Sequence, residues 1–94
     1  MTSPTPPFTE KQGQYLAFIY AYSVLNGRPP AEADMERFFC VTAPSVHAMV
    51  LELERKELIR RVPRQARSIE LIVGAADLPL LRPIQPIKTT VARY

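Results

Sequence analysis

The stretch SVHAMVLELERKELIRR, residues 45–61, is followed directly by VPRQARSIELIV, residues 62–73. The first segment carries apolar side chains at the spacing of one buried helical face: Val46, Met49, Val50 and Leu53. The pattern then changes to two short strand-like runs, 58–62 and 68–73, separated by a basic turn at 63–67. A helix, a strand, a basic loop and a second strand form the second half of a winged helix-turn-helix.

A first helix is predicted over residues 9–25. Thr9 is expected to cap it, and Gln12, three positions later, completes a capping box. Gly27 can adopt the left-handed backbone that ends a helix, and the prolines at 29–30 prevent the helix from resuming. Its apolar stripe comprises Tyr15, Leu16, Phe18, Ile19, Tyr22 and Leu25.

A second helix is predicted to start at Pro30, whose missing N–H is tolerated in a first turn. Glu32 and Asp34 complement the positive end of its dipole. A short turn at 40–43 leads to a third helix over about 44–57. Two helices joined by a turn of about four residues match the helix-turn-helix arrangement. The residues of the second helix expected to face inward are Met35, Phe38 and Phe39.

The chain has 94 residues, and a single packed domain is expected over 8–73. Residues 1–7 hold three prolines and three Ser or Thr residues, which predicts a disordered arm. Residues 74–94 include Pro79, Pro83 and Pro86, so an extended tail is expected there. The apolar residues of this tail are expected to pack on the domain or on a second copy. The predicted fold class is mainly α (α+β): three helices, a two-stranded β-hairpin wing and the tail.

The net charge is only +3, but the charges are unevenly distributed. Residues 55–67 hold six basic residues against one acid, Glu57, whereas 31–54 hold five acids against Arg37 alone. A basic edge orients a protein towards a polyanion. A solvated charge run is the other interpretation of this pattern. The six basic residues are Arg55, Lys56, Arg60, Arg61, Arg64 and Arg67.

Several classes of function are disfavoured by what the sequence lacks. A single cysteine, with no signal peptide and no apolar span of about 20 residues, predicts a cytoplasmic protein that does not enter a membrane. Cys40 and the only histidine, His47, do not make a four-ligand zinc set, so no metal is expected. Cys40 is expected to be a small buried turn residue. No cofactor or small-molecule substrate is expected, because no glycine-rich phosphate loop is present.

Residues 8–73 resemble the N-terminal DNA-binding domain of LexA-type SOS repressors, a family of bacterial regulators. The resemblance covers about two thirds of the chain. It is carried by FTEKQGQYLAFI at 8–19, by NGRPP at 26–30 and by APSVHAMVLELERKELIRRVPRQARSIEL at 43–71. The last segment is similar to the family's SVHxxLxxLExKGxIRR, followed by a wing that bears proline and arginine. The resemblance implies sequence-specific binding of double-stranded DNA by a repressor-like transcriptional regulator.

The resemblance also implies that the third predicted helix enters the major groove and that the wing lies on the DNA backbone. Ser45 and His47 carry suitable groups for a base edge, and Val46 can meet a thymine methyl. Carried over by position, the base-reading candidates are Thr42, Ser45, Val46, His47 and Met49. The phosphate-binding candidates are Arg60, Arg61, Arg64 and Arg67.

Three features depart from the family's pattern. Cys40 and Glu57 stand where the family usually has glycine. A left-handed backbone there costs a non-glycine residue about 1 kcal/mol, so both turns are expected to differ in detail. LexA repressors continue into a self-cleaving peptidase domain, whereas this chain stops at Tyr94. Self-cleavage is therefore not expected, and the chain is not expected to be an enzyme.

A winged-helix module that binds another protein is the alternative function. The third helix carries no Lys or Arg over 43–54, and 78–87 is more apolar than a free tail should be. A homodimer is also predicted, because one helix and one wing on a single half-site usually bind weakly. Its interface is expected in 78–91 or in the first helix.

Overall fold

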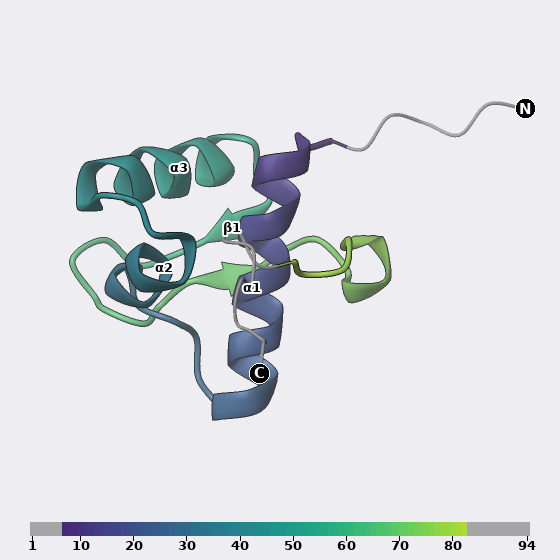
Figure 1. The fold of residues 1–94 in the computed structure, drawn as a ribbon, viewed down its shortest axis with the longest axis horizontal. Helices are drawn as coiled ribbons and strands as arrows, with labels where there is room; N and C mark the ends of the chain where they lie inside the picture. The colour runs from purple at the N-terminus through teal and green to yellow at the C-terminus, as the bar shows by residue number, and fades with distance from the viewer. Residues whose placement is uncertain (1–6, 83–94) are drawn as a thin grey trace, which may run out of the picture.

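The computed structural model describes residues 7–82 and contains three helices and a two-stranded antiparallel sheet (Figure 1). The first helix packs centrally, the second and third form the helix-turn-helix, and the hairpin is the wing. The predicted fold class is therefore confirmed. The elements are α1 (Glu10–Asn26), α2 (Glu32–Phe39), α3 (Ala43–Arg55), β1 (Ile59–Arg60), β2 (Glu70–Leu71) and a 3-10 turn, η1 (Ala75–Asp77).

Helix α1 begins and ends at the predicted signals. The Thr9 backbone N–H donates to Gln12 Oε1 at 3.0 Å, and the Gln12 N–H donates to Thr9 Oγ1 at 3.1 Å, which confirms the capping box. Gly27 ends the helix with a left-handed backbone at φ 70°. The predicted apolar stripe is wrong at Leu25, which is 82% exposed, because the last turns of α1 extend beyond the body of the molecule (Figure 1).

The core forms where α1 meets α2, α3 and the hairpin. The rings of Tyr15 and Phe39 stack with their centroids 4.1 Å apart. Burial raises the pKa of Tyr15 above its ordinary value, because an ionised phenolate loses hydration there. Phe38 is only partly buried, and the centroid of its ring lies 4.7 Å from that of Phe18. The side chains least exposed include Tyr15, Leu16, Ile19, Met35, Val46, Val50, Leu53 and Ile59.

The turns at Cys40 and Glu57 keep a left-handed backbone without glycine. Cys40 has φ 57° and Glu57 has φ 62°. The Leu58 N–H reaches back to the Leu53 carbonyl at 3.0 Å across the second turn, which closes α3. The expected change of turn geometry is therefore not seen at either position. Cys40 is exposed, so the prediction that it is a buried turn residue is also wrong.

The wing is held by a short ladder in which Ile59 pairs with Leu71 and Arg60 pairs with Glu70. The predicted strands at 58–62 and 68–73 are too long. Ser68 Oγ accepts the Val62 N–H at 2.9 Å and donates to carbonyl oxygens of the same loop, replacing strand pairing with a local turn.

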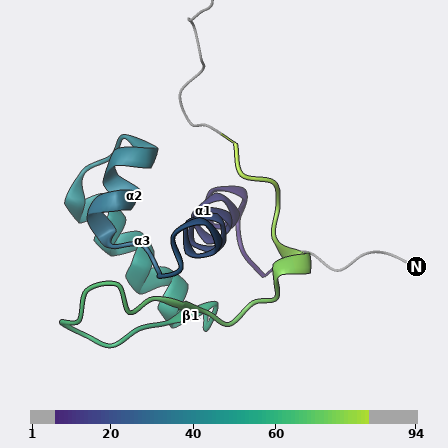
Figure 2. The same cartoon turned by 90° about the horizontal axis from the view of Figure 1, so that it is seen from below.

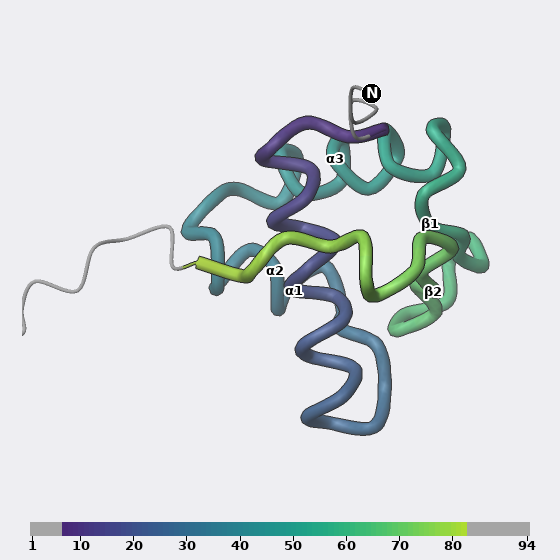
Figure 3. The backbone as a smooth tube through the Cα atoms, turned by 90° about the vertical axis from the view of Figure 1, so that its right-hand side faces the viewer, coloured from purple at the N-terminus to yellow at the C-terminus, as the bar shows by residue number. Residues whose placement is uncertain are grey.

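The tail crosses α1 on the side away from α2 and the wing (Figures 2 and 3). The Gln14 side chain donates through Nε2 to the Leu80 carbonyl at 2.8 Å and accepts the Arg82 N–H at 2.7 Å. Leu78 and Leu81 pack against the core. The tail is extended from Leu78 but not before it, because Ala75–Asp77 forms the 3-10 turn. The predicted arm and the end of the predicted tail, 1–6 and 83–94, lie outside the described residues.

Candidate nucleic-acid interface

The start of α3 is built by Thr42, which caps the helix. Thr42 Oγ1 accepts the Ser45 N–H at 3.3 Å and lies 3.0 Å from the Ser45 hydroxyl. Pro44 occupies the first turn, where its fixed φ suits a helix and no N–H is needed. Both hydroxyl side chains remain exposed. Thr42 and Ser45 therefore lie at the exposed N-terminal end of the helix, with hydroxyls that can turn towards a base or a phosphate.

Val46 points into the core, whereas its neighbours Ser45 and His47 are exposed. It is 0% exposed and belongs to the core, together with Val50 and Leu53 on the same stripe. The predicted contact between Val46 and a thymine methyl is therefore wrong, since the side chain would have to leave the core to reach a base. Met49 is partly buried against this core, so only part of its side chain is open to a ligand.

His47 projects from α3 and contacts the first turn of α2. Its Nδ1 lies 3.3 Å from Glu32 Oε2, and its side chain is 53% exposed. The other ring nitrogen, Nε2, is left for a partner on the exposed side. The contact links the two helices of the helix-turn-helix on an exposed surface of the domain.

Sequence reasoning missed two exposed residues on α3, Ala48 and Leu51. Both lie away from the stripe of Val46, Val50 and Leu53. The helical period alone was enough to find them, because positions 48 and 51 fall between the buried ones. Their apolar side chains offer van der Waals contact rather than hydrogen bonds.

Two of the four phosphate-binding candidates pair with carboxylates beside the wing. Arg60 Nε lies 2.8 Å from Glu70 Oε1, an exposed pair that raises the pKa of Arg60 and lowers that of Glu70. Arg61 Nε lies 3.2 Å from Glu54 Oε1, with only 16% of the arginine side chain exposed. Both guanidinium groups therefore already face a carboxylate in the DNA-free domain.

Arg64 lies exposed at the tip of the wing loop, in a left-handed backbone at φ 67°. Among residues 7–82 no carboxylate lies within 4.0 Å of it, unlike the other three candidates. Figure 2 shows this loop extending to the same side as α2 and away from the tail. Arg64 is therefore the candidate whose charge is most open to a phosphate.

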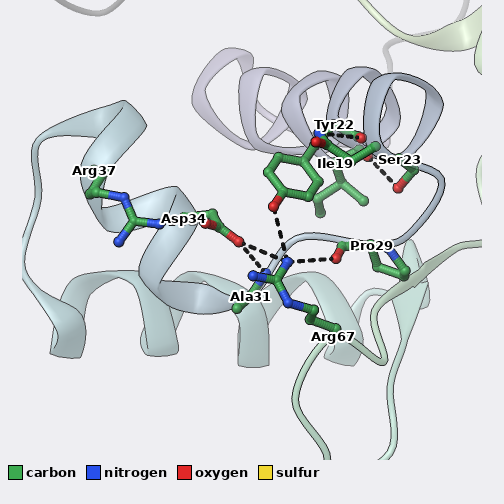
Figure 4. A network of polar contacts seen from close by, with 9 residues as sticks. Ile19, Tyr22, Ser23, Pro29, Ala31, Asp34, Arg37 and Arg67 are labelled. Carbon is green, nitrogen blue, oxygen red and sulfur yellow. Dashed lines mark hydrogen bonds and ion pairs between the residues drawn. The ribbon is translucent and has the colours of Figure 1, made fainter.

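Arg67, predicted as a phosphate contact, turns inward to contacts within the domain. Its Nη1 donates to the Tyr22 hydroxyl at 3.0 Å and to the Pro29 carbonyl at 3.2 Å (Figure 4). The same atom lies 3.1 Å from Asp34 Oδ2. These contacts depend on chain folding that brings the wing to the loop between α1 and α2, so a local sequence pattern does not reveal them.

A hollow of about 450 Å³ lies between the wing loop and the start of α2, with His47 of α3 at its edge. Glu32 and His47 border one side, and Arg61, Arg64 and Gln65 border the other.

Within the described part of the chain no group of three or more His, Cys, Asp or Glu side chains could hold a metal ion. Nor does any helix in residues 7–82 have the length and apolar character needed to cross a membrane.

Comparison with known proteins identifies relatives of this domain. The family model described as the LexA DNA binding domain matches residues 5–68. The LexA repressors of Thermosipho melanesiensis and Thermosipho africanus are 41% and 39% identical over 64 residues, which is 68% of this chain and 32% of each relative. The LexA repressor of Magnetococcus marinus is 35% identical over 69 residues, or 73% of this chain and 30% of the relative. The chain thus spans about a third of the length of these relatives.

Proposed function

This chain belongs to the LexA DNA-binding domain family, and we propose that it binds double-stranded DNA sequence-specifically as a repressor-like transcriptional regulator. The observation that supports the proposal best is that His47 on the exposed face of α3 and the basic wing loop line one hollow, together with the start of α2. An α-helix fits the major groove of B-DNA, and the neighbouring wing then lies along the phosphate backbone. The LexA repressors named above share this domain over about a third of their length.

In this proposal, different residues contact the bases and the phosphates of the DNA. Ser45 and His47 have exposed side chains that can donate to or accept from a base edge, and Thr42 and Met49 flank them. Arg64 holds a phosphate, with Arg60 and Arg61 contributing charge beside it. Because residues 43–54 carry no Lys or Arg, the affinity must come largely from the wing and the ends of α3.

We further propose that this domain acts by binding and not by catalysis, since the part of the relatives that it matches is a DNA-binding domain. Its proposed place is the bacterial cytoplasm, where the DNA is. A protein-interaction module remains the other candidate, favoured by the exposed Leu51 on α3. The tail supports that candidate less, because Leu78 and Leu81 already pack on their own domain.

A homodimer on palindromic DNA is part of the proposal, since two half-sites strengthen weak single contacts. The exposed Val24 and Leu25 at the end of α1 are apolar surface available to a second copy. Of the tail segment expected to contribute, the part up to Arg82 lies on α1, and 83–91 lies outside the described residues. Light scattering on DNA-free protein at high micromolar concentration tests this proposal, and a monomer there would contradict it.

A fluorescence-anisotropy titration of a labelled duplex at several salt concentrations tests DNA binding. If about four to six phosphates are neutralised, log affinity falls with log salt at a slope of roughly −4 to −5. Ser45→Ala and His47→Ala should each relax preference at one base position and leave that slope unchanged. Absence of salt-dependent binding to every duplex tried would overturn the proposal.

A further inference from the structure

The wing is weakly held by its own bonds. Each strand is two residues long, and the loop between them spans 61–69. A two-stranded hairpin of that size is marginal alone in water. Ser68 bonds only to Val62 and Gln65 of the same loop, which shapes the loop without fixing it to the helices. Ile59 and Ile69 pack in the core and Arg61 pairs with Glu54 of α3, so the base of the hairpin is fixed to the helices, and the placement of the loop is what needs a further attachment.

Arg67 supplies such an attachment, at the end of the loop where the chain returns to β2. Its guanidinium reaches Tyr22 on α1, the Pro29 carbonyl before α2, and Asp34 on α2 (Figure 4). The guanidinium carbon also lies 5.8 Å from the centre of the Tyr22 ring, within the range of a cation–π contact. A single side chain thus joins the wing to α1, to the connecting loop and to α2.

The Asp34 carboxylate contacts both the start of α2 and Arg67 of the wing. Its Oδ2 accepts the Ala31 N–H at 2.8 Å, at the start of α2, and also faces Arg67, while Oδ1 lies 2.5 Å from Arg37. Burial opposes ionisation, since only 9% of this side chain is exposed. The Ala31 N–H and the charges of Arg67 and Arg37 outweigh burial and hold the pKa of Asp34 below its ordinary value. The carboxylate that starts α2 is therefore also the charged partner that holds the wing.

We propose that Arg67, Asp34 and Tyr22 form a latch that sets the spacing between the wing and α3, and that DNA affinity depends on this latch. Arg67 is a positioning residue here, acting on DNA through the placement of Arg64 and not through a phosphate contact of its own. The inference rests on the proposed function. The inference goes beyond the proposed function because it makes an acidic residue, Asp34, necessary for binding a polyanion.

The substitution Asp34→Asn tests this proposal, because the two possible roles of Arg67 predict opposite signs. If Arg67 is a phosphate contact, removing its acidic partner frees the guanidinium and raises the net charge by one, so binding should tighten. If the latch sets the wing, binding should weaken despite the added positive charge. Asparagine retains one oxygen, which at the Oδ2 position can still accept the Ala31 N–H, so the start of α2 is preserved while the ion pairs with Arg67 and Arg37 are lost.

The matched control is Asp77→Asn in η1, which makes the same charge change at an exposed site. Among the described residues Asp77 has no cation within 4.0 Å, and η1, which contains it, lies on the tail side, away from the wing loop (Figure 2). Binding should be about threefold or more weaker for Asp34→Asn than for this control. Affinity equal to or tighter than that of the control would overturn the latch. Tyr22→Phe, which changes no charge, should weaken binding in the same direction.

Limited trypsin digestion followed by mass spectrometry gives a second readout, because it reports on the wing without DNA. Cleavage after Arg64 should be faster in Asp34→Asn and Tyr22→Phe than in the wild type or Asp77→Asn, whereas cleavage after Arg55 in α3 should be unchanged. Equal cleavage after Arg64 in all four proteins would also overturn the latch. Circular dichroism at 222 nm confirms that each variant is folded at the temperature used.

Failure of the latch and failure of the proposed function give different results. If the wild type binds no duplex, DNA binding itself is wrong, and the trypsin result still decides whether the latch holds the wing. If the wild type binds DNA and Asp34→Asn matches Asp77→Asn in affinity, the DNA-binding proposal is supported and the latch proposal is wrong.

Discussion

Glu57 holds a left-handed backbone at φ 62° with an exposed side chain. Such a conformation costs an L-residue about 1–2 kcal/mol, because Cβ crowds the neighbouring carbonyl. Within residues 7–82 no cation lies within 4.0 Å of its carboxylate to offset that cost. The local bonds of Glu57 and Leu58 back to α3 impose the conformation, so the strain comes from closing the helix at this point.

Replacing Glu57 with glycine should therefore stabilise the domain. The gain in the free energy of unfolding is expected at about 0.5–1 kcal/mol, since glycine removes the strain but is more flexible when unfolded. Urea unfolding followed by circular dichroism measures it. Glu57→Ala removes the same carboxylate but keeps Cβ, and it should show no such gain. An equal gain in both variants would contradict the strain argument.

Arg64 should account for a measurable share of the phosphate contacts. Arg64→Ala is expected to weaken DNA binding to a similar extent for all sequences and to flatten the salt slope by about one unit. Arg82→Ala removes one positive charge from a side chain that pairs with Glu10 of α1, not with the wing, and should leave the slope nearly unchanged. Equal slopes for the two variants would mean that Arg64 contributes only general charge.

At the scale of elements, sequence reasoning succeeded where the signals are local. The capping box at Thr9, the left-handed Gly27 and the order of three helices and a hairpin all depend on residues close in the chain. It failed where tertiary contacts decide. Arg67 looked like part of a basic run, and only folding brings it to Tyr22, 45 positions away. Val46 had been placed on both the buried stripe and the reading face, and burial decided between them.

The link between α2 and the wing through Asp34 should make stability depend on pH in acid. The pKa of Asp34 is lowered in the folded state, so its contribution is complete above the unfolded value of about 3.9 and is lost as pH falls through the folded value. The difference in unfolding free energy between wild type and Asp34→Asn should be constant above about pH 5 and shrink below about pH 4. Urea unfolding across this range measures it. A difference that stays constant down to pH 2 would contradict the ionised role of Asp34.

At the scale of the whole molecule, the basic edge is less free than its sequence indicates. Arg55, Arg60 and Arg61 pair with Glu52, Glu70 and Glu54 respectively, and Arg67 pairs with Asp34. The two exposed pairs, Arg55–Glu52 and Arg60–Glu70, are worth little to stability, and all four pairs weaken the positive potential that attracts a polyanion. The modest net charge of +3 and the partly neutralised arginines fit the proposal that affinity depends on base contacts and on a second copy as well as on charge.

The most direct test of the central claim is selection of a randomised duplex library by the purified protein at two salt concentrations, with the retained DNA sequenced. The account predicts enrichment of one motif at the higher salt, where non-specific phosphate binding is weakened. An inverted repeat would also support the dimer. Uniform retention of all sequences at low salt and loss of all at high salt would contradict sequence-specific reading by α3, and no retention at either salt would contradict DNA binding.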